Sequence, residues 1–277
     1  MLFEEERKQQ ISDHIQHAGR ASVQELALTF QVSESTVRRD LKDLEESGLV
    51  RRTHGGAVAL IQADNAEPSY VEKEDRFRLQ KEAIAREAAA LVREGDTIIL
   101  DSGTTTYYLA KAIKSVPRLT VVTNSIVVAQ ELAQQSNISL VLTGGTVRYE
   151  TLAMVGPMAE RALEQLRVDK TFLAINGIEP AAGLTTPSIT EAEMKRKMIH
   201  AGREVILLAD HSKYGKSVFA KVADLKDIDR LIADPLLPEM AKKELEEAGV
   251  QLTIAAEKRR MTHEPCSRYC NHESCCR

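Results

Sequence analysis

The 277-residue chain has no tryptophan, and its four cysteines all fall within the last twelve residues. A body without cysteine excludes a disulfide framework for the fold and is typical of a reducing compartment. No apolar run approaches the ~20 residues that a membrane span requires, and no apolar signal core follows the acidic stretch Glu4–Glu6. We therefore expect a cytoplasmic protein.

An excess of positive charge is also missing, because 37 lysines and arginines stand against 41 acidic residues, a formal net charge of −4. The first 56 residues are no exception, with eight basic residues against ten acidic ones. Net charge alone would argue against a nucleic-acid-binding protein. A basic surface on such a chain requires that the fold segregate the charges.

Residues 33–48 predict an amphipathic helix. Ser33 is a good N-cap because its hydroxyl can accept a hydrogen bond from an otherwise unpaired N–H of the first turn. The inward face consists of apolar residues at helical spacing, Val37, Leu41 and Leu44. Gly48 is placed where a left-handed residue would end the helix.

Two shorter helices and a hairpin complete this N-terminal unit. A helix over residues 7–17 ends at a break over residues 19–21, and Ser22 with Glu25 forms a capping box for the second helix. After the third helix, residues 49–60 predict a hairpin. Three short helices and a hairpin within about 60 residues are typical of a winged helix-turn-helix domain.

The outer side of the third helix and the hairpin carry groups that bind phosphates and base edges. We expect the basic side chains to converge on one surface and the acidic pair Glu45-Glu46 to lie elsewhere. The alternative is a small three-helix unit with an ordinary solvated face. The serine cluster, the paired arginines and the Gly-Gly hairpin tip together favour DNA binding. The candidate DNA-binding residues are Ser33, Ser35, Thr36, Arg38, Arg39, Lys42, Arg51, Arg52, His54 and Gly55.

The remainder of the chain alternates between apolar runs and amphipathic helices. Residues 61–74 are polar and lack periodicity, which predicts a linker, and residues 75–93 predict one long helix. The strands expected after Gly95 are residues 97–100, 119–122, 139–142, 170–175, 204–209, 229–232 and 250–254. This pattern predicts an α/β domain with a mostly parallel sheet covered by helices on both faces.

Three of these strands end in loops rich in threonine and glycine, at residues 101–106, 123–125 and 143–146. Because carboxyl ends of parallel strands meet at one edge, we expect the loops to line a common crevice. Glycine allows close backbone approach, helix N-termini favour anions, and threonine and asparagine can contact sugar hydroxyls. One such loop is common in any strand-to-helix turn. Three together predict a pocket for a phosphorylated, hydroxyl-rich metabolite.

Charged residues follow near the same edge. Glu191 and Lys195 are four apart on a predicted helix, a spacing that by itself is most often surface decoration. Residues 210–213, Asp-His-Ser-Lys, follow a buried strand, so Lys213 is placed to reach an anion in the crevice. His211 borders this loop and is expected either to contact a ligand or to pack.

The run VSESTVRRDLKDLEESGLVRRTHGGA, residues 32–57, resembles the N-terminal signature of the DeoR family of bacterial transcription regulators. The shared features are the serine-rich helix start, the Arg-Arg-Asp-Leu core at 38–41 and the His-Gly-Gly-Ala wing at 54–57. The resemblance extends over about residues 5–255. It implies a C-terminal effector domain similar to ribose-5-phosphate isomerase, in which the DxGTT, TN, TGG, ExxxK and DxSK segments surround a sugar phosphate.

With this resemblance, the candidate effector-binding residues are Asp101, Gly103, Thr104, Thr105, Thr123, Asn124, Thr143, Gly144, Gly145, Asn176, Glu191, Lys195, Asp210, Ser212 and Lys213. Residues 183–187 with Glu191-Ala192 resemble family members that respond to fructose 1-phosphate or similar sugar phosphates. We expect no cofactor and no bound metal.

Two functions are consistent with these features. The first is a transcription regulator, a repressor of a sugar-catabolic operon relieved by a phosphorylated sugar, which binds double-stranded operator DNA as a homo-oligomer (dimer or tetramer). The alternative is an enzyme similar to sugar-phosphate isomerases with an accessory DNA-binding domain. Such isomerases need a carboxylate base. Where they carry an aspartate-rich strand end, this chain has Asn176, which cannot act as a base, although Glu191 could. We therefore expect binding without turnover.

The expected domain division is a winged helix-turn-helix domain over 1–60, a linker over 61–74, an α/β effector domain over 75–256 and a tail over 257–277. The tail holds residue types that ligate soft metals, His263, Cys266, Cys270, His272, Cys275 and Cys276. Their spacing matches no common zinc pattern, and the tail lacks the apolar residues needed to fold. We therefore expect a disordered appendage.

Overall fold

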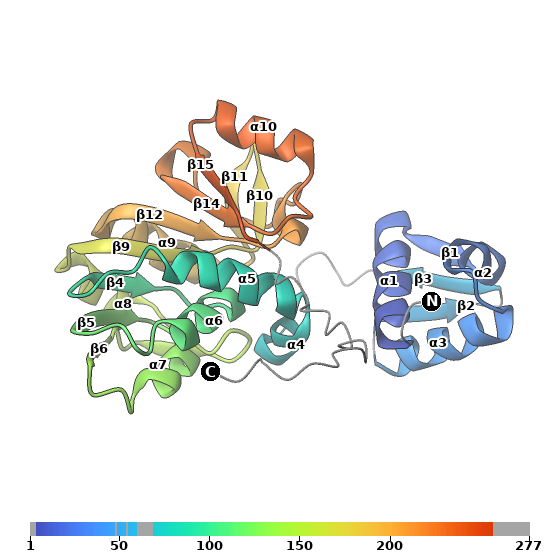
Figure 1. Cartoon of the computed structure of the whole chain (residues 1–277), viewed down its shortest axis with the longest axis horizontal. Helices are drawn as coiled ribbons and strands as arrows, with labels where there is room; N and C mark the ends of the chain where they lie inside the picture. Colours follow the sequence, from blue (N-terminus) through green and yellow to red (C-terminus); the bar gives the residue numbers. More distant parts are fainter. Residues whose placement is uncertain (1–3, 48, 54, 60–68, 257–277) are drawn as a thin grey trace, which may run out of the picture. The chain divides into compact units, whose positions relative to one another are not determined.

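The computed structural model describes residues 4–47, 49–53, 55–59 and 69–256. The chain divides into two compact units, unit 1 (Met1–Ala66) and unit 2 (Glu67–Arg277), shown in Figure 1. The predictions for Gly48, His54, most of the linker and the cysteine-containing tail lie outside the described residues. In the part that is described, no helix is long and apolar enough to cross a membrane.

Unit 1 has the small helix-turn-helix fold with an antiparallel sheet that the sequence predicts. Its elements are α1 (Glu4–Ala18), β1 (Arg20–Ser22), α2 (Val23–Phe30), α3 (Glu34–Glu46), β2 (Val50–Thr53) and β3 (Gly56–Ala59). The strands lie in the order β1-β3-β2. Residues 19–21 predict only a break, whereas β1 pairs with β3 and places Ala21 opposite Ala57.

Side-chain caps set where α2 and α3 begin. The Ser22 hydroxyl accepts the Glu25 N–H at 3.1 Å, and the Glu25 carboxylate accepts the Ser22 N–H at 3.4 Å. The Ser33 hydroxyl accepts the Thr36 N–H at 3.2 Å and lies 2.8 Å from the Ser35 hydroxyl. Both predicted N-caps are confirmed, and each such cap contributes about 1 kcal/mol.

The core of unit 1 contains one charged side chain, Asp40. The predicted inward residues of the helices form the apolar part of the core, Ile11, Ile15, Leu26, Val37, Leu41 and Leu44. Asp40 is 0% exposed, and its two carboxylate oxygens accept hydrogen bonds from Arg7 of α1 at 2.7 and 3.1 Å. This bidentate pair joins α1 to α3 and satisfies the buried charge.

Unit 2 is built on a seven-stranded parallel sheet in the order β15-β14-β12-β9-β4-β5-β6, which confirms the predicted α/β class. The strands are β4 (Thr97–Leu100), β5 (Leu119–Thr123), β6 (Ile138–Leu142), β9 (Val168–Ala174), β12 (Gly202–Leu208), β14 (Arg230–Ala233) and β15 (Gln251–Ile254).

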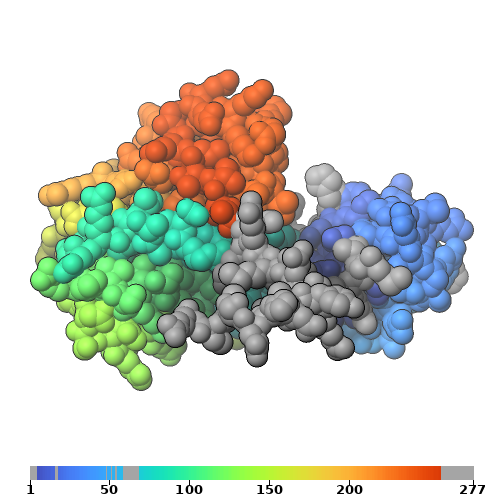
Figure 2. All heavy atoms as spheres, viewed as in Figure 1, coloured from blue at the N-terminus to red at the C-terminus, as the bar shows by residue number. Residues whose placement is uncertain are grey.

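Helices cover both faces of this sheet (Figure 1). They are α5 (Arg78–Ala89), α6 (Thr104–Ala112) and α7 (Ile126–Leu132) on one face and α8 (Pro157–Glu164), α9 (Ile189–Ala201) and α10 (Glu239–Glu247) on the other. Alternate strand residues separate the two cores, because Ile98 and Leu100 pack on the first face and Ile99 packs on the second. In Figure 2 the C-terminal elements of the unit (orange to red) form a lobe above α5 (teal).

Two short antiparallel sheets interrupt the parallel pattern and are absent from the sequence-based prediction. One consists of β7 (Thr146–Arg148) and β8 (Ala153–Val155), and the other of β10 (Gly177–Glu179), β11 (Gly183–Thr186) and β13 (Ala220–Ala223). Strands of three or four residues are too short for hydrophobic periodicity to reveal them.

The single helix predicted over residues 75–93 is wrong. Two helices, α4 (Tyr70–Asp75) and α5, meet at Arg76 and Phe77, and α4 includes residues predicted to be linker. Arg76 is extended, and Phe77 has a φ of +55°, a left-handed conformation that costs an L-residue about 1–2 kcal/mol. No glycine or proline marks this corner, so helical periodicity continues across it.

Replacement of Arg7 by leucine is expected to lower the free energy of unfolding of unit 1 by about 3 kcal/mol, because Asp40 would stay buried with an unpaired charge. Urea denaturation of the full chain, followed by hydrogen exchange of unit 1 amides, measures this change. Glu34→Gln is the matched control, since it removes an exposed ion pair with Arg38 and should change stability by less than about 1 kcal/mol. Equal effects of the two substitutions would contradict the role of Asp40.

Candidate functional site

Unit 1 presents most of its candidate residues on the outside of α3 and the hairpin. Those exposed are Ser33, Ser35, Arg38, Arg39, Lys42, Arg52 and Gly55, and Thr36 is half-buried. The side chain of Arg51 and the whole of His54 lie outside what the structure describes. An open cavity of about 280 Å³ adjoins this surface and is lined by Val23, Arg38, Leu41, Arg52, Thr53 and Gly56.

Acidic side chains lie beside these cations, which corrects the expectation that they lie elsewhere. The ion pairs are Arg38–Glu34 at 3.3 Å, Lys42–Glu46 at 3.7 Å and Arg52–Glu45 at 3.9 Å. Every member of these pairs is at least 41% exposed. Exposed pairs contribute little, so a phosphate group can replace the carboxylate as the partner of each cation.

The hairpin requires glycine at position 56. A Cβ on Gly56 would lie 2.1 Å from the carbonyl oxygen of Ala21, where no side chain fits. The neighbouring Gly55 carbonyl accepts the Val23 N–H at 2.9 Å, which ties the hairpin to the start of α2. The Gly-Gly pair therefore fixes the basic hairpin against the helices.

In unit 2, Asp101 and Lys195 form a buried ion pair of 2.5 Å at the carboxyl edge of the sheet. Asp101 also accepts the N–H groups of Ser102 at 2.8 Å and Ala174 at 3.0 Å. Lys195 also donates to the Ala174 carbonyl at 2.9 Å. These two predicted site residues therefore join the ends of β4 and β9 to α9.

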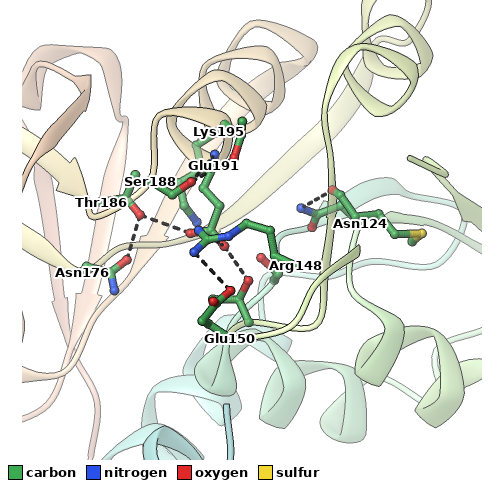
Figure 3. Close-up of polar contacts among 12 residues, drawn as sticks. Asn124, Arg148, Glu150, Asn176, Thr186, Ser188, Glu191 and Lys195 are labelled. Carbon is green, nitrogen blue, oxygen red and sulfur yellow. Dashed lines mark hydrogen bonds and ion pairs between the residues drawn. The ribbon is translucent and has the colours of Figure 1, made fainter. Parts of the chain in front are cut away.

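Glu191 lies at the centre of a second cluster (Figure 3). Its carboxylate accepts a hydrogen bond from Thr151 at 2.6 Å, and Arg148 forms an ion pair with it at 3.4 Å. The Thr186 hydroxyl lies within hydrogen-bonding distance of both Glu191, at 3.3 Å, and Asn176, at 3.0 Å. Glu191 of α9 is therefore held by the β7–β8 hairpin and by β11, and it is only 3% exposed.

The threonine- and glycine-rich loops are closely packed. A Cβ on Gly103 would lie 2.7 Å from a methyl carbon, and one on Gly145, which has a φ of +113°, would lie 2.6 Å from a carbonyl oxygen. Thr123 donates to the Leu100 carbonyl at 2.7 Å. The buried threonines of these loops are Thr104, Thr105, Thr106, Thr123 and Thr143, and Gly144 is half-buried.

Asn124 has a buried acceptor atom that is left unpaired. The residue is 1% exposed, and its amide nitrogen donates to the Met154 carbonyl at 3.3 Å. Its amide oxygen has no hydrogen-bond partner among the described residues. An unpaired buried oxygen of this kind costs about 1–3 kcal/mol, and the hydroxyl group of a ligand would satisfy it.

The loop after β12 is organised by Asp210, which is also buried. Its carboxylate accepts the Ser212 N–H at 3.0 Å and the Ser212 hydroxyl. Burial favours a higher pKa for Asp210, but Lys213, Ser212 and Lys81 outweigh it and hold the pKa below its usual value. Asp210 is therefore an anion, and Lys213 lies half-buried beside it.

Lys81 of α5 is a charged residue near this loop that is absent from the candidates. It is only 4% exposed, and burial lowers the pKa of Lys81 to about 8, against the attraction of Asp210. Lys213 lies close enough to repel it. The sequence does contain one signal for the burial of Lys81. Position 81 lies on the same helix face as Ile84, Ala85 and Ala88, all of them buried.

Other residues of the site have no such signal. Arg148 and Thr151 reach Glu191 through the β7–β8 hairpin, which the sequence does not reveal. His211, which the sequence predicts either to contact a ligand or to pack, packs on Phe77 with ring centroids 4.8 Å apart. Within the described ranges, no three or more His, Cys, Asp or Glu side chains are grouped to hold a metal ion, and the cysteine-containing tail lies outside those ranges.

Comparison with known proteins matches both units. A family model described as the DeoR C terminal sensor domain matches residues 77–235, and one described as the DeoR-like helix-turn-helix domain matches residues 7–63. The HTH-type transcriptional regulator YulB of Bacillus subtilis is 41% identical over 90% of this chain and 95% of its own length. The glycerol-3-phosphate regulon repressor of Haemophilus influenzae is 33% identical over 90% of this chain and 96% of its own length.

Among solved structures, ribose 5-phosphate isomerase A of Methanocaldococcus jannaschii aligns over 50% of this chain and 54% of its own, with 20% identity and a TM-score of 0.36.

Lys81 is expected to make the free energy of unfolding rise at alkaline pH. Its native pKa is about 8 against an ordinary value of 10.5, so between these pH values the unfolded chain binds more protons than the native chain. The gain over this range reaches up to about 3 kcal/mol. Urea denaturation of wild type and Lys81→Met from pH 7.5 to 10 measures this gain. The difference in free energy of unfolding between the two proteins should grow as the pH rises. A difference between wild type and Lys81→Met that stays constant with pH would contradict the prediction, and Lys226→Met, which removes an exposed lysine, is the control.

Proposed function

Because the chain belongs to the DeoR family of helix-turn-helix transcriptional regulators, we propose that it acts in the cytoplasm as a repressor of a sugar-catabolic operon and that a phosphorylated sugar relieves the repression. The observation that carries this proposal is the unpaired amide oxygen of Asn124, a buried group at the carboxyl edge of the unit 2 sheet, where the chain after β4 and at the end of β5 also carries buried threonines. The relatives are transcriptional regulators, not enzymes, which favours binding without turnover over the isomerase alternative.

DNA binding belongs to residues 1–60 in this proposal. Helix α3 enters the major groove, with Arg38 and Arg39 contacting base edges or phosphates and Arg52 contacting the backbone. The support is that α3 exposes these cations and that the pairs of Arg38 and Lys42 lie at the surface, where ion pairs contribute little. Since the protein as a whole is acidic, affinity should be modest and should fall steeply with salt.

One winged module has limited affinity, and such sites are usually read in pairs. We therefore propose a homo-oligomer, a dimer or a tetramer, that presents two copies of α3 to half-sites about one helical turn, or a multiple of it, apart. The effector regulates by binding one arrangement of the oligomer better than another.

Effector binding belongs to residues 75–256. Lys213 and Lys81 supply positive charge for a phosphate, and the N-terminus of α6 at Thr104 supplies N–H donors. The Asn124 oxygen accepts a hydrogen bond from a sugar hydroxyl. We propose fructose 1-phosphate or a similar sugar phosphate as the ligand. The Haemophilus relative is named as the repressor of a glycerol-3-phosphate regulon, and a regulon named for a phosphorylated metabolite supports the proposal of a phosphorylated effector.

Substitution of Arg39 by alanine is expected to weaken binding to a selected operator about 10- to 100-fold, because a contact to a base or phosphate is lost. Selection of duplexes from a random library with the wild-type protein, followed by fluorescence anisotropy at several salt concentrations, measures the effect. Arg118→Ala is the matched control, an arginine that is 80% exposed on unit 2. Similar affinities for both variants would show that α3 does not bind DNA through Arg39.

Saturating fructose 1-phosphate is expected to weaken operator binding by the wild-type protein about tenfold or more. Lys213→Ala should reduce affinity for the sugar phosphate at least about tenfold, because an ion pair with the phosphate is removed. Calorimetry with fructose 1-phosphate, glycerol 3-phosphate and ribose 5-phosphate measures binding, with the exposed Lys226→Ala as control. If none of the three binds or changes operator affinity, the phosphorylated effector is the wrong ligand class. Turnover of ribose 5-phosphate that disappears in Glu191→Gln would instead favour the isomerase.

A further inference from the structure

The corner between α4 and α5, residues 73–81, is held in a strained conformation. Phe77 has a φ of +55°, which L-residues adopt rarely and which persists only where the surroundings enforce it. The corner lies at the start of unit 2, and α4 begins after the N-cap Ser69. Among the described elements, α4 is the first one after β3, the last strand of the DNA-binding unit.

One contact attaches the corner to the loop that contains Asp210. The rings of Phe77 and His211 are 4.8 Å apart at an interplanar angle of 72°, and the Arg76 guanidinium lies 5.2 Å from the centre of the Phe77 ring. His211 is itself fixed, since its Nδ1 lies 3.0 Å from Asp234, which is fully buried. The position of Phe77 therefore depends on the position of the loop.

A second contact joins α5 to α4 across the corner. The buried ammonium group of Lys81 donates a hydrogen bond to the carbonyl oxygen of Lys73 in α4. The same ammonium interacts electrostatically with Asp210 and Lys213 of the loop. Lys81 thus bonds α4 while it lies within electrostatic reach of the cation that we assign to the effector phosphate.

We propose that the α4–α5 corner is the coupling element of the protein: an anion bound beside Lys213 attracts the Lys81 ammonium away from the Lys73 carbonyl and releases α4. This inference rests on the proposed function. Regulation requires a contact that the effector makes in one conformation and lacks in the other. The contact between the bound anion and Lys81 is of this kind. With the Lys81 bond exchanged, the Phe77–His211 contact still joins the corner to the loop, and loop movement is passed on to α4 through it.

The test compares the full chain with Phe77→Leu, which removes the ring contact but keeps an apolar side chain. Leu79→Ala is the matched control, because Leu79 lies two residues after Phe77, in α5, and is 74% exposed. Without ligand, amide exchange of residues 70–76 should be about tenfold faster in Phe77→Leu than in wild type or in Leu79→Ala. Equal exchange in all three proteins would overturn the attachment whatever the effector is.

The second arm adds fructose 1-phosphate. Calorimetric affinity for it should agree within about twofold among the three proteins, while exchange of residues 70–76 rises on binding in wild type and Leu79→Ala. The ligand-dependent change in operator affinity should be about tenfold or more in those two and below about twofold in Phe77→Leu. A full response in Phe77→Leu would overturn the coupling and leave the proposed function intact. Absence of binding heat in wild type would reject this effector and the coupling with it.

Discussion

The buried ion pair between Asp101 and Lys195 is the contact on which the carboxyl edge of the unit 2 sheet depends. Both charges are removed from water, and such a pair is favourable only when the remaining hydrogen-bonding groups are satisfied. Here the backbone of Ala174 supplies both a donor and an acceptor. The pair therefore joins β4, β9 and α9 in one rigid arrangement. In the proposed mode of effector binding, the surrounding groups do not need to be ordered on binding, which reduces the entropy that binding must overcome.

This arrangement changes how the predicted site residues are understood. Asp101 and Lys195 lie at the carboxyl edge of the sheet but are engaged with each other, and Glu191 is held by Thr151 and Arg148. Among the described residues, Asn124 keeps an unpaired acceptor, and Lys81 and Lys213 are cations near Asp210. A residue in a motif shared with a family can therefore hold the structure together without being free to touch a ligand.

The features that sequence predicted correctly are local ones. Ser22 and Ser33 cap helices within three residues of themselves, and the apolar runs form strands whose ends align because the sheet is parallel. The features it missed depend on distant partners. Asp40 is explained only by Arg7, and the break at Phe77 is explained only by the chain that packs on it. Lys81 is an intermediate case. Its burial could be predicted from the helix face that it shares with apolar residues, whereas its contact with Lys73 could not.

The Arg7–Asp40 pair has a consequence for how such regulators diversify. It lies within unit 1, as does the apolar core around it, so α3 is oriented by contacts inside its own unit. Ser35, Arg38, Arg39 and Lys42 are not part of that core. In the proposed mode of DNA binding, substitutions at these positions would alter the operator that is read while leaving the fold and the sensor untouched. Evolution can therefore change the gene under control and the metabolite that is sensed in separate steps.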